Sequence, residues 1–310
     1  MQLINWGGWI ISALLWVLTA AIAAPTSAAE QVPAKTAAIR PASQSAKNAI
    51  AKAAATPAKK SKKDQPDVRS NAVLVIDAAD SSVLFARHAT FASPIASITK
   101  LMTALVVLEA GQPLDEPIII TPADRDLEKG SASRLSVGAN LSRGDLLHLA
   151  LMSSDNRAAH AVGRRYPGGL PKLIAAMNVK ARGLGMSSAK FVDPTGLSEG
   201  NVASAEDLAR LVIAASRNTT IRRFSTDTRF SVAVGKRRLE FRNSNTLVAK
   251  SDWDIELQKT GYTNEAGRCL VMKTMIDGRS VVIVLLDSFG KYTRVADARR
   301  IRRWLEGRQA

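Results

Sequence analysis

The sequence predicts an α+β fold in which an antiparallel sheet is flanked by helices and carries a helical insertion lobe. Three observations predict it. Strand-like segments begin the folded region, near residues 72–87, and recur near its end, at residues 268–288. Helical patterns fill the chain between them. One sheet built from both ends of a domain, with helices inserted between, is a layered α+β arrangement.

The first strands are expected in "AVLVIDAADSSVLFARHA", on either side of a turn at residues 79–82. A helix is expected next, in "SITKLMTALVVLEA", because this run is apolar over several turns. Gly111 and Pro113 follow it and are typical residues at a helix end.

Capping boxes predict two later helix starts, one at Ser142 with Asp145 and one at Ser204 with Asp207. The first of these helices is expected to break at residues 153–156, where small and polar residues interrupt the apolar pattern. Side chains at such a break can project from a loop into a cleft.

The end of the chain predicts a hairpin and a final helix. Asp277-Gly278 lies between two apolar runs and is a strong turn signal. The helix is expected at about residues 292–305, with apolar residues at helical spacing: Val295, Ala298, Ile301 and Leu305. We expect this stripe to pack on the sheet, and a role at a membrane surface is the alternative.

The charge of the chain is concentrated near its ends. The formal net charge is +16 over 310 residues. Residues 30–70 hold nine Lys or Arg and three acidic residues, and residues 291–310 hold seven against two. A nucleic-acid-binding domain would carry its basic face on the folded body, so no nucleic-acid partner is expected. Basic ends fit peripheral association with an anionic cell envelope.

Composition divides the chain into three parts. Residues 1–29 are uncharged and apolar, end in small residues and predict a signal peptide, with an uncleaved anchor as the alternative. Residues 30–68 are rich in Ala, Lys and Pro and predict a disordered basic linker. Residues 69–310 form the expected folded domain. A leader of this kind predicts a periplasmic protein, secreted across the inner membrane.

Ser97 and Lys100 lie three residues apart at the start of the apolar helix, so they share one helix face. A serine hydroxyl needs a base to become a good nucleophile. A lysine amine can be that base when burial or a nearby positive charge lowers its pKa from about 10.4. The spacing alone is a weak signal, because Ser187 and Lys190 repeat it outside any expected helix.

Two further motifs indicate that Ser97 and Lys100 form a catalytic pair. Ser154-Asp155-Asn156 falls at the helix break, where Asn can bind an amide carbonyl and Ser can pass a proton to a leaving amine. The residues Lys259, Thr260 and Gly261 fall on an expected strand. There they supply positive charge, a hydrogen bond to a carboxylate, and space for the close approach of a substrate backbone. The order Ser-x-x-Lys, Ser-x-Asn, Lys-Thr-Gly is specific.

With these motifs the chain resembles the low-molecular-mass penicillin-binding proteins, the serine D-alanyl-D-alanine peptidases. The resemblance runs from about Asn71 to Trp304 through "ASITKLMTALVVLEA", "SRLSVGANLSRGDLLHLALMSSDNRAA", "FVDPTGLSEGN" and "KTGYTNEAGRCLVM". It is nearest to the D-alanyl-D-alanine endopeptidase branch, the penicillin-binding protein 7 type. It implies the fold shared by β-lactamases and DD-peptidases, with peptidoglycan stem peptides and β-lactam antibiotics as partners.

The resemblance also implies a role for each motif residue. The catalytic residues would be Ser97, Lys100, Ser154 and Asn156, and the substrate-binding residues would be Lys259, Thr260, Gly261 and Tyr262. The backbone N–H groups of Ser97 and Tyr262 would stabilise the oxyanion.

The resemblance also distinguishes among the enzymes that share these motifs: β-lactamases, carboxypeptidases and endopeptidases. A class A β-lactamase carries Glu-x-x-Leu-Asn between the second and third motifs, whereas "FVDPTGLSEGN" offers only Glu199, so efficient β-lactamase activity is not expected. Typical carboxypeptidases of this class continue into a β-rich domain and a membrane anchor, and the sequence ends about fifty residues after Gly261. We therefore expect an endopeptidase. The alternatives are a carboxypeptidase and a non-catalytic wall-binding or penicillin-sensing protein.

The remaining candidate ligands predict no cofactor. Cys269 is the only cysteine and lies in an apolar run, so a buried structural thiol is expected. The three histidines, His88, His148 and His160, show no metal-ligand spacing. We expect neither a metal nor an organic cofactor.

Overall fold

A computed structural model describes residues 65–127 and 129–307 of the chain. The expected signal peptide at 1–29 and most of the expected linker at 30–68 lie outside the described residues. Val68, at the end of that linker, is only 4% exposed and packs into the core of the domain.

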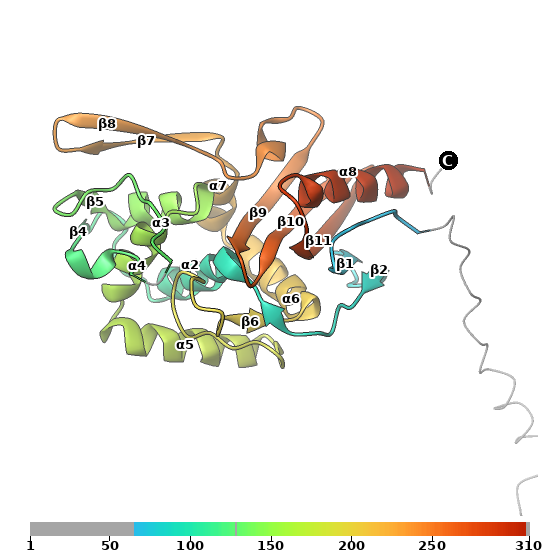
Figure 1. Ribbon diagram of the computed structural model, residues 1–310, viewed down its shortest axis with the longest axis horizontal. Helices are drawn as coiled ribbons and strands as arrows, with labels where there is room; N and C mark the ends of the chain where they lie inside the picture. The colour runs from blue at the N-terminus through green and yellow to red at the C-terminus, as the bar shows by residue number, and fades with distance from the viewer. Residues whose placement is uncertain (1–64, 128, 308–310) are drawn as a thin grey trace, which may run out of the picture. The chain divides into compact units, whose positions relative to one another are not determined.

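The centre of the domain is an antiparallel sheet with the strand order β2-β1-β11-β10-β9 (Figure 1). Its strands are β1 (Ala72–Asp77), β2 (Val83–Arg87), β9 (Asp254–Thr263), β10 (Gly267–Ile276) and β11 (Arg279–Ser288). The first strand pairs with the last, with Val75 opposite Ile283. The expectation that both ends of the domain build one sheet is confirmed.

Helices cover both faces of this sheet, which is why its central strands are apolar on both sides. Leu74 and Val284 face the core that α6 (Ala205–Ser216) helps to form. Val75 and Ile283 face the opposite core. The final helix, α8 (Thr293–Glu306), contributes three buried residues to that second core: Ala298, Ile301 and Leu305. The expected packing of this helix on the sheet is confirmed.

The insertion between β2 and β9 is mostly helical. Its longer helices, besides α6, are α2 (Thr99–Glu109), α3 (Arg143–Met152), α4 (Asn156–Arg164), α5 (Gly169–Gly183) and α7 (Thr219–Thr226). The residues from Thr99 to Val107 in α2 are all buried. A helix that is apolar nearly all round is stable only when other elements surround it, and α2 contacts α3, α4, α5, α6 and α7.

The helix starts follow the capping boxes. Ser142 accepts the N–H of Asp145 before α3, and Ser204 accepts the N–H of Asp207 before α6. The helix is interrupted between α3 and α4, as expected. There Asp155 caps the new helix by accepting the N–H of Ala158 at 2.9 Å. This break places Ser154 in a tight loop between two packed helices and Asn156 at the first residue of α4.

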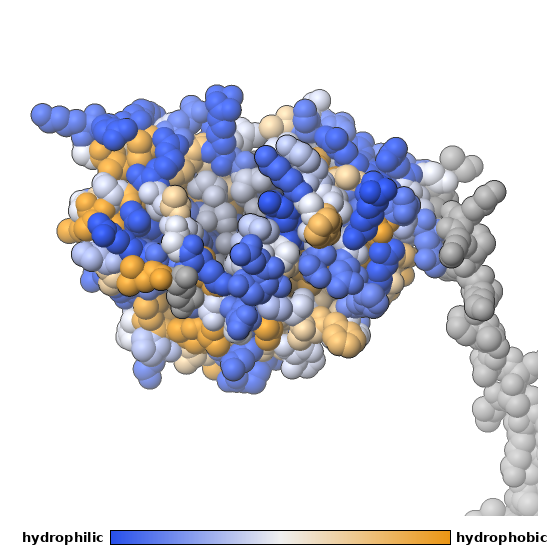
Figure 2. Space-filling view, viewed as in Figure 1, coloured by the Kyte–Doolittle hydropathy of each residue, from blue (hydrophilic) through white to orange (hydrophobic). Residues whose placement is uncertain are grey.

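Some elements were not foreseen in the sequence. These are α5, α7, the hairpin of β7 (Arg229–Val234) and β8 (Arg237–Arg242), and the short pairs β3 (Ser93–Pro94) with β6 (Val202–Ala203) and β4 (Pro117–Ile119) with β5 (Asn140–Ser142). The β7–β8 hairpin projects from the helices (Figure 1), and in this region hydrophilic side chains form the outer edge, with hydrophobic ones beneath them (Figure 2). Within the described residues, no helix combines the length and the hydropathy needed to span a membrane.

A buried carboxylate on α8 fixes the start of the first strand. Asp297 is fully buried, and its Oδ2 accepts the backbone N–H of Arg69 at 3.0 Å, the N–H of Ser70 at 2.7 Å and the hydroxyl of Ser70 at 2.6 Å. Its Oδ1 accepts a hydrogen bond from Arg300 at 2.7 Å. One side chain therefore satisfies several buried donors and joins the two ends of the domain.

We expect Asp297→Ala to lower the free energy of unfolding by about 3 kcal/mol, because it leaves buried N–H and hydroxyl donors without an acceptor. Urea denaturation measures the change. The matched control is Asp252→Ala, which removes an exposed carboxylate that pairs with Arg302 at 3.2 Å. That loss costs under about 1 kcal/mol. Equal losses in the two variants would show that Asp297 does not hold the strand.

Candidate active site

The amine of Lys100 is the centre of the candidate site. Residues Ala96–Ile98 form a short 3-10 turn that leads into α2, which places Ser97 and Lys100 on one face. Lys100 is only 1% exposed. Its Nζ lies 2.7 Å from Ser97 Oγ, 2.6 Å from Asn156 Oδ1 and 2.6 Å from the carbonyl oxygen of Thr195. Three separate segments of the chain therefore meet at one nitrogen.

This geometry suits both protonation states of the amine. A charged ammonium donates one proton to each of the three oxygens. A neutral amine has two N–H groups and one lone pair, so it can donate to the amide oxygen of Asn156 and the carbonyl of Thr195 while it accepts the hydroxyl proton of Ser97. Asn156 Oδ1 and the Thr195 carbonyl have no proton to give, which directs the lone pair at Ser97.

Burial favours the neutral state. It lowers the pKa of Lys100 from 10.5 to about 7, against the opposing effect of the carboxylates of Asp193, Asp155 and Asp126. At neutral pH a large share of Lys100 is therefore a free amine next to a serine hydroxyl.

The second motif lies beside the first. Ser154 occupies the left-handed backbone region with φ 63°, which turns its side chain out of the α3–α4 break. Its Oγ accepts a hydrogen bond from Lys259 Nζ at 2.8 Å. Asn156 is fixed at its other end, where its Nδ2 donates to Ser131 Oγ at 2.8 Å. Both side chains of the motif are thus oriented toward the two lysines.

The third motif forms one wall of the site on β9. Lys259 is fully buried and also donates to the carbonyl of Thr260 at 2.8 Å. Burial, together with the charges of Lys100 and Arg294, lowers the pKa of Lys259 well below its usual value. The hydroxyl of Thr260 donates to Ser244 Oγ at 2.7 Å.

Gly261 permits a close approach, and the neighbour that the structure shows belongs to the chain itself. A Cβ at Gly261 would lie 2.9 Å from the carbonyl oxygen of Ile95 and 3.2 Å from the backbone nitrogen of Ser97. From the sequence alone, this space was expected to serve the substrate backbone. Here it lets β9 lie directly against the segment that carries Ser97.

Tyr262 follows on the same strand and is 52% exposed. Its ring lies under the guanidinium of Arg268, 4.2 Å from it, and its hydroxyl donates to Asn264 at 3.0 Å. Because Gly261 approaches the backbone nitrogen of Ser97, the N–H groups of Ser97 and Tyr262 belong to neighbouring segments of the site.

The backbone carbonyl of Thr195, which accepts a hydrogen bond from Lys100, was not foreseen in the sequence. Asp193 shapes this turn by accepting the N–H groups of Thr195, Gly196 and Ser198 at 2.6, 2.7 and 3.0 Å. Such a set of local hydrogen bonds is typical of an Asp that begins a turn. The segment "DPTG" therefore predicts a turn, but it does not predict that the carbonyl of Thr195 binds Lys100.

Gly196, the next residue of this turn, packs closely against the segment that carries Ser97. Its φ of 81° lies in the left-handed region, and a Cβ there would lie 1.9 Å from the carbonyl oxygen of Ala96.

A second contact that was not foreseen involves α8. Arg294 of this helix donates a hydrogen bond to the carbonyl of Gly261 at 2.7 Å and so helps to hold β9 in place.

Cys269 lies opposite Gly261 on the neighbouring strand β10 but makes none of the hydrogen bonds that hold the cluster together. Cys269 is buried and its pKa is raised to about 11 by burial, as a structural thiol requires. Within residues 65–127 and 129–307, His, Cys, Asp and Glu side chains form no group of three or more that could bind a metal ion. The described side chains of the cluster are amines, hydroxyls and an amide, which are groups for acyl transfer.

The fold and this cluster define a serine acyl-transfer site, and comparison with known proteins identifies the family. The profile described as D-alanyl-D-alanine carboxypeptidase matches residues 59–290. The chain therefore belongs to the D-alanyl-D-alanine carboxypeptidase family of serine peptidases.

Relatives and solved structures agree with this assignment. The chain is 46% identical to a D-alanyl-D-alanine endopeptidase of Escherichia coli, over 84% of each chain. It is 47% identical to a D-alanyl-D-alanine endopeptidase of Pseudomonas aeruginosa, over 83% of this chain and 84% of the relative. The crystal structure of the Streptomyces K15 DD-transpeptidase matches with a TM-score of 0.72 and 25% identity, over 77% of this chain and 98% of that one.

A penicillin-binding protein homologue from Mycobacterium tuberculosis is similar in structure too. It matches with a TM-score of 0.72 and 26% identity, over 78% of this chain and 93% of that one. The expected α+β fold of the DD-peptidases is thereby confirmed.

We expect Gly196→Ala to lower the free energy of unfolding by about 3 kcal/mol or more. The added methyl group meets a backbone carbonyl and must adopt a left-handed conformation. The matched control is Gly235→Ala in the β7–β8 turn, where φ is 58° but nothing lies within 4 Å of the new Cβ. Only the backbone cost of about 1–2 kcal/mol remains there. Chemical denaturation compares the two, and equal losses would contradict the steric argument.

Proposed function

We propose that the protein is a peptidoglycan D-alanyl-D-alanine endopeptidase that hydrolyses D-alanyl cross-links through a serine acyl-enzyme. One observation carries the proposal: the buried amine of Lys100 lies 2.7 Å from Ser97 Oγ and is held by two acceptors that leave its lone pair for the serine proton. A hydroxyl paired with a neutral amine is an activated nucleophile.

Acylation begins when Lys100 accepts the proton of Ser97. The Ser97 oxygen attacks the carbonyl carbon of the D-alanyl residue, and a tetrahedral oxyanion forms. The backbone N–H groups of Ser97 and Tyr262 are the proposed donors to that oxyanion. Loss of one such donor typically lowers the rate by about 10²–10³.

The leaving amine then needs a proton. Ser154 is the proposed donor, because its oxygen accepts from Lys259 and its own proton is free to point into the site. The peptide C–N bond breaks, and the acyl group stays on Ser97. The proton that Lys100 took from Ser97 then replaces the one that Ser154 gave up, so Lys100 is a free amine again. Lys100 next deprotonates a water molecule, which attacks the ester. The acid is released, and Lys100 returns the proton to the Ser97 oxygen, which restores the hydroxyl.

The remaining motif residues position the substrate. Asn156 offers an amide beside the lysine and is proposed to bind the amide carbonyl before the scissile bond. Thr260 and Lys259 are proposed to contact a substrate carboxylate from β9. A β-lactam would acylate Ser97 by the same steps and remain attached, because its leaving group stays tethered to the acyl group.

The endopeptidase assignment is supported by the relatives. Those at 46% and 47% identity are named D-alanyl-D-alanine endopeptidase, while the family description is that of a carboxypeptidase. Carboxypeptidase activity is therefore the second candidate. A non-catalytic wall-binding protein fits less well, because a lysine buried at a cost to stability gives a binder no advantage.

We further propose a periplasmic location. The support is the apolar leader at residues 1–29 followed by the basic linker at 30–68. Basic residues in that linker would favour peripheral contact with an anionic envelope.

We expect the purified protein to convert cross-linked muropeptide dimers into monomers, and Ser97→Ala to abolish both this reaction and covalent labelling by a fluorescent penicillin. Chromatography of the digests and gel fluorescence measure the two activities. The matched control is Ser187→Ala, which removes the exposed serine of a second Ser-x-x-Lys pair and retains both.

Labelling of the Ser97→Ala variant would refute the nucleophile. A pentapeptide monomer distinguishes the two candidate activities. An endopeptidase leaves its terminal D-alanine in place under conditions that split the dimers, and a carboxypeptidase removes it.

Acylation is expected to depend on the protonation of Lys100. Because its pKa is about 7 and only the free amine accepts the serine proton, the rate rises as the pH increases. The labelling rate should increase about tenfold between pH 6 and pH 8 and then level off. Stopped-flow measurement with a fluorescent penicillin tests this. A rate that keeps rising until pH 10 would show that Lys100 has an ordinary lysine pKa.

A further inference from the structure

The β7–β8 hairpin concentrates the positive charge of the central part of the chain. Residues 71–290 have a net charge of +5, and the hairpin at residues 229–242 supplies +4 of it, from five basic residues and one acidic residue. Figure 1 shows that the hairpin projects from the helices. The charge is therefore gathered on a ribbon that stands out from the domain.

One face of this ribbon is a row of mostly charged side chains. Residues directly opposite each other on paired strands place their side chains on the same face. The register puts three such pairs on the outer face: Arg229 with Arg242, Ser231 with Glu240, and Ala233 with Arg238. All of them except Ser231 are exposed. The other face packs on the domain through buried residues that include Val232 and Leu239.

The arginine pair of the outer face is not neutralised within the hairpin. Like charges directly opposite each other destabilise a sheet. Glu240 Oε1 lies 3.6 Å from a guanidinium nitrogen of Arg229 and of Arg242, whose side chains are 61% and 71% exposed. This separation is too long for a hydrogen bond, and one carboxylate balances only one of the two charges. An anionic partner would relieve the remaining repulsion.

The tip of the ribbon adds three more cations. Lys236 lies in the turn, and Arg237 and Arg238 begin β8. All three are exposed, and none forms a salt bridge with another residue in the described ranges 65–127 and 129–307. A guanidinium group holds its N–H donors in a planar fork that matches a carboxylate. The ribbon therefore suits a partner that carries several carboxylates along its length.

The base of the ribbon is joined to the candidate active site. Two residues after β8, Ser244 Oγ accepts the hydroxyl of Thr260 at 2.7 Å. The backbone nitrogen of Ser244 donates to the carbonyl of Met152, the last residue of α3, at 2.9 Å. A strand rises about 3.3 Å per residue, so the six residues of β7 extend about 20 Å from this base. A partner on the ribbon is therefore bound next to the catalytic cluster but outside it.

The proposed reaction supplies a partner with this chemistry. Each cut leaves a D-alanyl carboxylic acid, which is ionised at neutral pH, so a wall polymer that is being cut carries carboxylates on the peptides around the site. An anionic lipid surface fits less well. Membrane-binding surfaces combine basic residues with exposed large apolar ones, and residues 229–242 expose no large hydrophobic side chain.

We propose that the outer face and the tip of the β7–β8 hairpin form an exosite for carboxylates of the wall-polymer peptides next to the cross-link that is cut. The inference rests on the proposed peptidase function. It gives the hairpin a role in holding the enzyme on the polymer, which the catalytic cluster does not supply.

The test measures how the full-length protein sediments with purified insoluble peptidoglycan, before and after the carboxylates of the polymer are converted to neutral amides. All proteins carry Ser97→Ala, so that the polymer stays intact. The hairpin variant adds Arg229→Gln, Arg238→Gln and Arg242→Gln. At low ionic strength we expect its Kd for the untreated polymer to rise about tenfold, which corresponds to about 1.4 kcal/mol shared by three exposed ion pairs. After amidation, the proteins with and without the hairpin changes should bind equally.

The matched control variant carries Arg182→Gln, Arg210→Gln and Arg217→Gln instead. These three arginines are exposed and lie on α5, on α6 and directly after α6. The control loses the same charge as the hairpin variant, and both keep the basic residues at 30–68. Its Kd for the untreated polymer should stay within about twofold of the parent value, because its arginines lie outside the ribbon.

Other outcomes overturn the proposal. Equal weakening in the hairpin and control variants would show that net charge alone matters. A difference that persists after amidation would show that the ribbon does not recognise carboxylates. If the hairpin changes abolish binding to vesicles of phosphatidylglycerol and phosphatidylethanolamine but leave polymer binding intact, the ribbon binds lipid instead.

Penicillin labelling of the proteins with Ser97 intact is measured in parallel. Its absence from the wild-type protein would contradict the proposed peptidase function, whereas the sedimentation result concerns the hairpin alone. The two failures are therefore distinguishable.

Discussion

The contact between one buried amine and three oxygens from distant parts of the chain is the constraint on which this structure depends. Lys100 comes from the first turn of α2, Asn156 from the start of α4, and the Thr195 carbonyl from a loop before β6. A buried lysine is costly unless its hydrogen bonds are satisfied. The helices and loops must therefore pack in one relative arrangement, and the same arrangement directs the amine at Ser97.

Local backbone strain accompanies this arrangement. Ala96 and Ser154 both occupy the left-handed region, with φ of 47° and 63°, although neither is glycine. Each such residue costs about 1–2 kcal/mol. The apolar helix α2 and the two cores on the faces of the sheet hold the strained segments in place. Strain of this kind is common where a side chain is aimed at a reacting group.

Much of this could be read from the sequence. The apolar runs on either side of Asp277-Gly278 and the capping boxes at Ser142 and Ser204 are local signals, and each lies where it was expected. The motif residues could be found because their side chains carry the chemistry.

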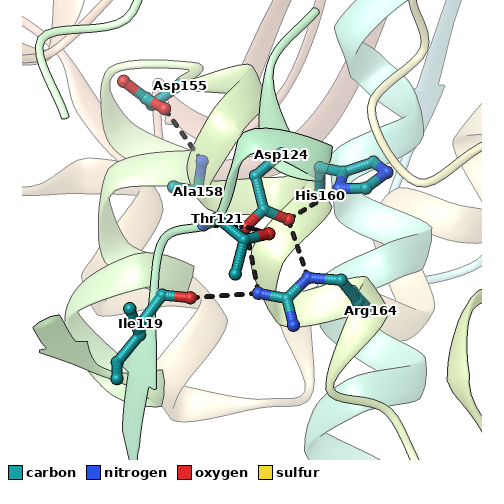
Figure 3. Close-up of polar contacts among 7 residues, drawn as sticks. All are labelled: Ile119, Thr121, Asp124, Asp155, Ala158, His160 and Arg164. Carbon is teal, nitrogen blue, oxygen red and sulfur yellow. Dashed lines mark hydrogen bonds and ion pairs between the residues drawn. The ribbon is translucent and has the colours of Figure 1, made fainter. Parts of the chain in front are cut away.

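The rest depends on tertiary contacts. The Thr195 carbonyl is a backbone group that every residue has, so its role as a ligand of Lys100 leaves no mark in the sequence. The space at Gly261 was assigned to the substrate, whereas the structure fills it with the segment of Ile95 to Ser97. His160 appeared as an ordinary structural histidine, because its relation to Asp124 (Figure 3) arises only when α4 packs against the 3-10 helix at residues 122–124.

The most direct measurement of the central claim is an NMR titration of the Lys100 side chain in protein labelled with ¹³C at lysine Cε, assigned by the signal that a Lys100→Arg variant loses. If Lys100 is the base, the midpoint lies near pH 7. A midpoint near the ordinary lysine value of about 10.4 would contradict it.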